Sequence, residues 1–163
     1  MNVFIGYGNP LREDDGVGWA IAEEARSVLE AGGVQVLVCH QLTPELALDL
    51  IDAAKAVFVD ACVEGRPGEI ARRSVSAEDA VLGGFSHHVT PALLLASARA
   101  IGGTAPETLL ITVTGARFGF GETLSAPVAA AVPEAAGAGA RFLGLAPHHP
   151  PRQGPLEREE RHA

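Results

Sequence analysis

The chain has few basic residues, few cysteines and no long apolar run. Its 12 lysines and arginines face 20 aspartates and glutamates, which gives a formal net charge of −8. This balance argues against nucleic acid or an anionic membrane as partner, because both attract positively charged proteins. No apolar run approaches the about 20 residues of a membrane-spanning helix. The two cysteines, Cys39 and Cys62, lie in or beside predicted buried strands. No signal peptide precedes them, so we expect inert core thiols in a cytoplasmic protein.

Several nucleotide-binding and catalytic motifs are also absent. Glycine-rich segment 6–18 follows a short apolar strand, but it has Leu11 where a dinucleotide-binding fingerprint needs its third glycine. The Gly-Lys-Ser/Thr of a phosphate-binding loop is missing, and so are a Ser-His-Asp motif, a suitable cysteine nucleophile and the His-Glu-x-x-His of zinc proteases. The segment does contain Asn9 and the adjacent carboxylates Asp14 and Asp15. An amide and two carboxylates suit a metal ion, a proton or a backbone amide, and not a phosphate.

Predicted strands and helices alternate along the chain. A length of 163 residues with 47% hydrophobic residues indicates one globular domain with a substantial core. Apolar periodicity and capping signals predict a three-layer α/β/α sandwich around a mostly parallel sheet. The predicted strands are 2–7, 34–38, 56–60, 69–75 and 109–113; the predicted helices are 15–31, one that opens at Thr43-Pro44, 91–101 and 125–143.

Two boundaries follow from composition and spacing. Only residues 63–68 separate strands 56–60 and 69–75, whereas a parallel crossover needs about a dozen residues. Strand 69–75 is therefore predicted to be antiparallel, in a hairpin with strand 56–60. Residues 147–163 are rich in proline and charge and have little to bury, so we expect a single domain over 1–146 followed by a disordered tail.

Candidate functional side chains gather at one edge of the predicted sheet. Asp15 follows the first strand, Asp60 closes the third, and His87 and His88 lie in the loop before helix 91–101. Ligands of parallel sheets bind at the carboxyl ends of the strands. Two carboxylates and an imidazole suit a borderline divalent ion such as nickel or zinc, and would equally serve acid–base chemistry.

Each candidate also has a purely structural interpretation, and these stay open at this point. Asp14 or Asp15 is a suitable N-cap for helix 15–31, although one cap explains only one of the two aspartates. Asp60 is a suitable turn former. Either His87 or His88 is consistent with a solvated side chain or with one that caps a neighbouring carbonyl.

The motifs together resemble the hydrogenase maturation endopeptidases. The opening segment Gly6-x-Gly-Asn-Pro-Leu-x-x-Asp-Asp-Gly-x-Gly18 is similar to the N-terminal signature of that family. The resemblance covers residues 2–143 in order and spacing. It continues through Leu42-Thr43-Pro44-Glu45, Phe58-Val59-Asp60-Ala61, Ser86-His87-His88-Val89-Thr90-Pro91 and Gly119-x-Gly121-Glu122-x-Leu124-Ser125.

The resemblance implies a fold, an activity and a set of ligands. Members are soluble nickel-dependent proteases that remove a C-terminal extension from the large-subunit precursor of a [NiFe] hydrogenase after nickel insertion. Their sheet has five strands, one of them antiparallel, and the last strand lies between the third and the antiparallel one. We prefer this order to the hairpin. The family's metal ligands map onto Asp15, Asp60 and His87, with His88 as the alternative register.

The implied mechanism uses nickel that the substrate supplies. In this hypothesis Asp15, Asp60 and His87 complete the coordination of nickel already held by substrate cysteines, and a water activated by the metal or by a carboxylate attacks the scissile bond. Two alternatives remain. One is a non-catalytic nickel-sensing assembly chaperone for the same precursor, and the other is a different hydrolase on the same scaffold.

Overall fold

The structure, a computed structural model, describes residues 1–82 and 88–145 of the chain and contains one five-stranded sheet. The strand order is β2-β1-β3-β5-β4. The strands are β1 (Asn2–Tyr7), β2 (Val34–Cys39), β3 (Lys55–Cys62), β4 (Ile70–Val75) and β5 (Glu107–Thr114). All neighbouring strands are parallel except β4, which pairs antiparallel with β5. The predicted mostly parallel sheet with one antiparallel strand is confirmed.

The hairpin predicted for β3 and β4 is wrong, because β5 lies between them. The order implied by the family resemblance is correct. Turn 63–68 reverses the chain as expected, but it does so around the end of β5. Gly68 N donates to Thr114 O at 2.8 Å, and Thr114 N donates to Glu69 O at 2.9 Å. The Thr114 hydroxyl donates to Glu64 O at 2.8 Å. The turn therefore bonds to the end of β5, which occupies the place between β3 and β4.

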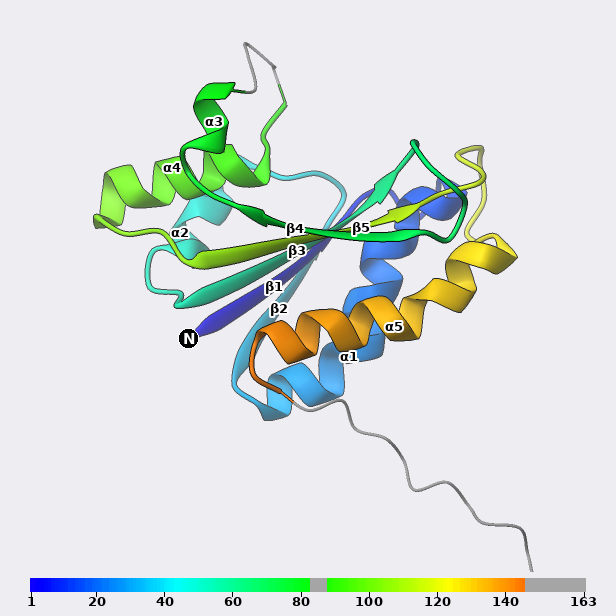
Figure 1. Cartoon of the computed structure of the whole chain (residues 1–163), viewed down its shortest axis with the longest axis horizontal. Helices are drawn as coiled ribbons and strands as arrows, with labels where there is room; N and C mark the ends of the chain where they lie inside the picture. Colours follow the sequence, from blue (N-terminus) through cyan, green and yellow to red (C-terminus); the bar gives the residue numbers. More distant parts are fainter. Residues whose placement is uncertain (83–87, 146–163) are drawn as a thin grey trace, which may run out of the picture.

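Helices cover both faces of the sheet (Figure 1). One face carries α1 (Val17–Ala31) and α5 (Ala126–Phe142), and the other carries α2 (Ala47–Leu50) and α4 (Pro91–Gly102). The short helix α3 (Asp79–Leu82) contacts α4, and two 3₁₀ turns, η1 (Glu13–Gly16) and η2 (Pro44–Leu46), precede α1 and α2. This is the predicted α/β/α sandwich.

Strand β3 shows why the sheet is buried on both sides. Val57 and Val59 point into the core beneath α1 and α5, whereas Ala56 and Phe58 point into the core beneath α2 and α4. All four side chains are fully buried. Side chains alternate between the faces of a strand, so a continuous apolar run is what a doubly covered strand requires.

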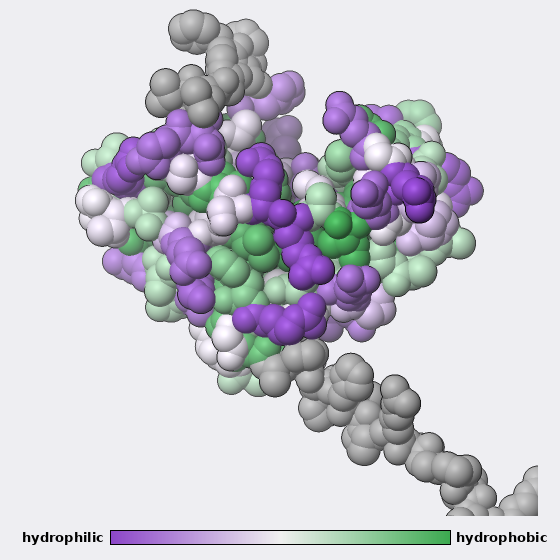
Figure 2. Space-filling model, in the orientation of Figure 1, coloured by the Kyte–Doolittle hydropathy of each residue, from purple (hydrophilic) through white to green (hydrophobic). Residues whose placement is uncertain are grey.

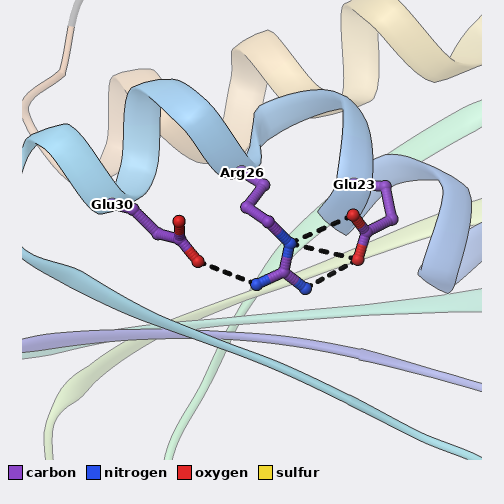
Figure 3. A network of polar contacts seen from close by, with 3 residues as sticks. All are labelled: Glu23, Arg26 and Glu30. Carbon is purple, nitrogen blue, oxygen red and sulfur yellow. Dashed lines mark hydrogen bonds and ion pairs between the residues drawn. The ribbon is translucent and has the colours of Figure 1, made fainter.

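Local sequence signals explain where the helices begin and what their outer faces carry. Thr90 Oγ1 accepts a hydrogen bond from Leu93 N at 3.2 Å, which caps α4. On the solvent side of α1, Arg26 forms ion pairs with Glu23 at 2.6 Å and Glu30 at 2.9 Å (Figure 3). Such exposed pairs one turn apart stabilise a helix only slightly. Within residues 1–82 and 88–145, no helix is long and apolar enough to cross a membrane.

Candidate functional site

A cleft of about 480 Å³ lies at the carboxyl edge of the sheet. Its lining includes Asp15 after β1, His40 after β2, Asp60 of β3 and His88 just before α4. Figure 2 shows the surface hollowed at this edge, between the side that carries α4 and the loops that follow β3 and β5. Asp15, Asp60 and His88, which the sequence assigned to a site, therefore line one cavity.

Close packing of glycines sets the position of Asp15. A Cβ at Gly8 would collide with the carbonyl oxygen of Asp15, and Gly8 has a φ of +135°, which disfavours any other residue. At Gly18, a Cβ would lie 2.6 Å from Val59 O and 2.7 Å from Tyr7 O. Helix α1 thus packs directly on the sheet. The half-buried Asp15 carboxylate accepts a hydrogen bond from Asn9 N at 2.7 Å, which fixes it in the cleft.

Asp60 lies two residues before the end of β3, so it is a strand residue and not a turn former. Its Oδ1 accepts a hydrogen bond from Ala61 N at 2.8 Å, and the Tyr7 hydroxyl also bonds to the carboxylate. Burial, together with the negative charge of Asp15, raises the pKa of Asp60 to about 6. Burial and the adjacent Asp60 charge raise the pKa of Tyr7, which keeps its hydroxyl a donor. The two carboxylates are therefore close enough to repel, and a cation between them would relieve that repulsion.

Asp14 has a different role from the cap considered for it. Helix α1 has Gly16 at its N-cap with no side-chain capping bond, so neither Asp14 nor Asp15 caps it. Asp14 is completely buried, and its carboxylate accepts hydrogen bonds from Ala116 N, Arg117 N, Ser125 N and Ser125 Oγ at 2.7–2.9 Å. Burial alone would raise the pKa of Asp14, but these hydrogen bonds together lower it. Asp14 therefore anchors the loop between β5 and α5.

This anchoring accounts for both aspartates of the opening motif. Asp14 is not part of the cleft lining and holds loop 115–125, while Asp15, the next residue, lines the cleft. It also gives a physical reason for the Ser125 motif before α5, which the sequence analysis had only as part of the family resemblance. Local sequence patterns could not reveal this contact, because its donor and acceptor lie 111 positions apart.

Of the two histidines in the loop before α4, the structure describes only His88. His88 lines the cleft, whereas His87 lies outside the described residues. Among residues 1–82 and 88–145, no group of three histidine, cysteine or acidic side chains is arranged to hold a metal ion. The metal-ligand set of Asp15, Asp60 and His87 therefore stays a prediction. The structure shows only that Asp15 and Asp60 line the same cleft.

Sequence reasoning missed His40 and placed the cysteines in or beside buried strands. His40 follows β2 at the same edge and packs edge-on against Trp19, with ring centroids 5.4 Å apart. Its position after a parallel strand is the same signal that identified Asp15. Cys39 and Cys62 are free, as expected; both are half-buried, and Cys39 packs against the core beneath α2 and α4. Burial raises the pKa of the Cys39 thiol, which keeps it protonated and unreactive.

Comparison of the structure with solved structures identifies the fold. The hydrogenase maturating endopeptidase HybD from E. coli is 23% identical and matches with a TM-score of 0.70 over 90% of this chain and 95% of that chain. A hydrogenase 2 maturation peptidase from Thaumarchaeota archaeon SCGC_AB-539-E09 is 25% identical, with a TM-score of 0.66 over 88% and 98%. The [NiFe] hydrogenase maturation protease HycI from Thermococcus kodakarensis KOD1 is 22% identical, with a TM-score of 0.72 over 88% and 92%.

No protein-family model and no curated protein sequence matches the chain. The solved structures nevertheless match over 88–90% of this chain and 92–98% of their own length. The chain therefore has the fold of the hydrogenase maturation endopeptidases, and the resemblance that the sequence motifs predicted is confirmed.

Proposed function

We propose that the protein is a cytoplasmic endopeptidase that removes the C-terminal extension of a [NiFe]-hydrogenase large-subunit precursor after nickel insertion. The observation that carries this proposal is the pair of carboxylates, Asp15 and Asp60, held by backbone amides in one cleft at the carboxyl edge of the sheet. The fold in which this cleft occurs is the one shared with hydrogenase maturation peptidases.

The donor set suits a nickel ion that arrives with the substrate. Asp15 and Asp60 supply oxygen ligands, and His87 is proposed to supply a ring nitrogen, a combination that fits a borderline divalent ion. The mutual repulsion that helps to raise the pKa of Asp60 is the kind of unbalanced charge that a cation neutralises. Nickel in the substrate then serves for recognition and for polarisation of the scissile carbonyl.

The side chains of the protein itself supply position and proton transfer. Asn9 N holds the Asp15 carboxylate, and Ala61 N and Tyr7 hold that of Asp60, so both carboxylates face the substrate in fixed orientations. We propose that one carboxylate of this pair accepts the proton of an attacking water. After attack on the carbonyl, that proton passes to the leaving amine as the C–N bond breaks.

Processing of a defined precursor separates the protease from the two alternatives. Purified protein is incubated with the large-subunit precursor of a [NiFe] hydrogenase from the same genome, once loaded with nickel and once without it. Mass spectrometry of the products is expected to show one C-terminal cut in the nickel-loaded sample only. A stable complex without cleavage supports the nickel-sensing chaperone, and cleavage independent of nickel supports another hydrolase.

A further inference from the structure

An exposed aromatic side chain stands on the loop that Asp14 anchors. Phe120 is 94% exposed, and Leu11, on the neighbouring loop, is 52% exposed. Arg12 and Arg117 are also exposed, and the guanidinium of Arg12 lies over the Phe120 ring at 5.9 Å. We call these four residues, Leu11, Arg12, Arg117 and Phe120, the Phe120 platform.

Hydrogen bonds between the two loops fix the platform. Gly121 N donates to Leu11 O at 2.9 Å, and Glu13 N donates to Gly121 O at 2.8 Å, so the backbone on either side of Arg12 pairs with Gly121. Arg12 Nη2 donates to Phe118 O at 2.6 Å. Phe120 is therefore presented to solvent by a backbone that is bonded at both flanks, in addition to the four bonds to Asp14. Groups that are ordered before binding lose less entropy when they bind.

The two arginines of the Phe120 platform are available to a partner. Neither Arg12 nor Arg117 forms an ion pair within the described part of the chain. The carboxylate of Glu13 accepts a hydrogen bond from Gly119 N at 3.0 Å and so is already engaged. An exposed aromatic ring with an arginine guanidinium over it has the composition of an interface hot spot. Its complement is an apolar recess bordered by carboxylates.

We propose that the Phe120 platform docks the folded body of the large-subunit precursor while its C-terminal extension occupies the cleft. This inference rests on the proposed function. The platform and the cleft are parts of one segment, since Leu11 and Arg12 precede Asp15 by only a few residues, which favours a single large partner that contacts both. The partner is expected to present acidic and apolar residues there.

Two other occupants are less compatible with the charges. An anionic membrane surface is repelled by a chain with a net charge of −8. A second copy of the chain, docked symmetrically through the same surface, would bring both pairs of arginines into one interface.

The test measures the concentration dependence of single-turnover cleavage of nickel-loaded precursor. Phe120→Ala is expected to raise the half-saturating enzyme concentration about tenfold and to leave the maximal rate within about twofold, because it removes binding energy that is equal in the ground and transition states. The matched control is Ile101→Ala, which removes a 64% exposed side chain from α4.

Arg117→Gln keeps the backbone bonds to Asp14 and is expected to slow association and to weaken its salt dependence. Arg141→Gln, on α5, controls for a general loss of charge.

Each outcome supports or overturns the platform. It is overturned if Phe120→Ala binds and cleaves the precursor like the Ile101→Ala control. Two further results would overturn it, provided that Phe120→Ala binds the precursor as tightly as wild type does. One is a dimer, seen by ultracentrifugation, that only Phe120→Ala dissociates. The other is wild type that pellets with anionic vesicles. Failure of wild type to cleave any nickel-loaded precursor would instead remove the proposed function. Precursor binding by biolayer interferometry then still tests the platform, since equal affinities for wild type and Phe120→Ala would overturn it.

Discussion

Ser125 donates two hydrogen bonds to the carboxylate of Asp14, one from its backbone amide at 2.7 Å and one from its hydroxyl at 2.8 Å, across 111 positions of sequence. This buried contact connects the loop after β1 to the start of α5. Because Asp15 is the next residue, the contact also fixes the base of the proposed site. The stability of the loop and the geometry of the cleft are therefore expected to depend on the same carboxylate.

Asp14→Asn is expected to lower the free energy of unfolding by about 2–3 kcal/mol at pH 7, because it weakens charge-assisted hydrogen bonds in a buried position. The pKa of Asp14 is lowered from its ordinary value of 3.8. The carboxylate therefore stabilises the fold above about pH 4, and this contribution disappears as the pH falls through the lowered folded-state pKa. Urea denaturation at pH 7 and pH 3 measures the difference.

Ser125→Ala provides the graded comparison for Asp14. It removes only the hydroxyl bond and keeps the backbone bond, so a loss of about 1 kcal/mol is expected. If Asp14→Asn and wild type have the same free energy of unfolding at pH 7, the negative charge of Asp14 contributes nothing to stability.

Asp60→Asn is expected to stabilise the protein near pH 7.5 by about 2–3 kcal/mol, since one unit of pKa corresponds to about 1.4 kcal/mol. The folded-state pKa of Asp60 is raised from 3.8 to about 6. The folded state therefore binds the proton more tightly than the unfolded chain, and stability is lost as the pH rises from about 4 through about 6. The gain from the substitution is expected to shrink to nothing near pH 4. The exposed Asp52→Asn is the control, and a gain of the same size at both pH values would argue against this origin.

His87→Gln is expected to reduce cleavage of nickel-loaded precursor by orders of magnitude, whereas His88→Gln is expected to retain it. The reason is the register of the family motif, which places the ligand nitrogen on His87. His88 lines the cleft, so the opposite result, loss with His88→Gln alone, would assign the ligand to His88. Thermal melts of both variants separate loss of the ligand from loss of the fold.

Gly18→Ala is expected to destabilise the protein by about 3 kcal/mol or more, because the added methyl group would lie 2.6 Å from Val59 O and force α1 off the sheet. Gly137→Ala is the matched control within α5. There the nearest atom belongs to the flexible end of Arg141, so a gain of up to about 1 kcal/mol in helix propensity is expected. Similar effects of the two substitutions on the midpoint of urea unfolding would contradict the close packing at Gly18.

The sequence was sufficient for the layers of the fold and for the placement of Asp15 and Asp60 at one edge of the sheet. Apolar runs such as β3 determine burial on both faces, and strand polarity determines that Asp15 and Asp60 lie at one edge. The position of β5 between β3 and β4 was not readable from local spacing. A six-residue turn permits either a hairpin or a path around a third strand, and only long-range bonds to Thr114 distinguish them.

Local sequence patterns also could not show that Asp14 and Asp15 have different roles. Both are acidic residues at a helix start, and local rules assign either of them to a cap. Their separation into a buried anchor and a cleft residue depends on Ser125, far along the chain. The tail 147–163 and His87 lie outside the described residues, so the expectations for them stay predictions.

The most direct test of the central claim is single-turnover cleavage of nickel-loaded large-subunit precursor by wild type and by Asp60→Asn, with a thermal melt of each protein beside it. The account predicts that Asp60→Asn loses cleavage by orders of magnitude while its melting temperature at neutral pH equals or exceeds that of wild type. Near-normal cleavage by Asp60→Asn would contradict the claim that this carboxylate recognises the substrate nickel.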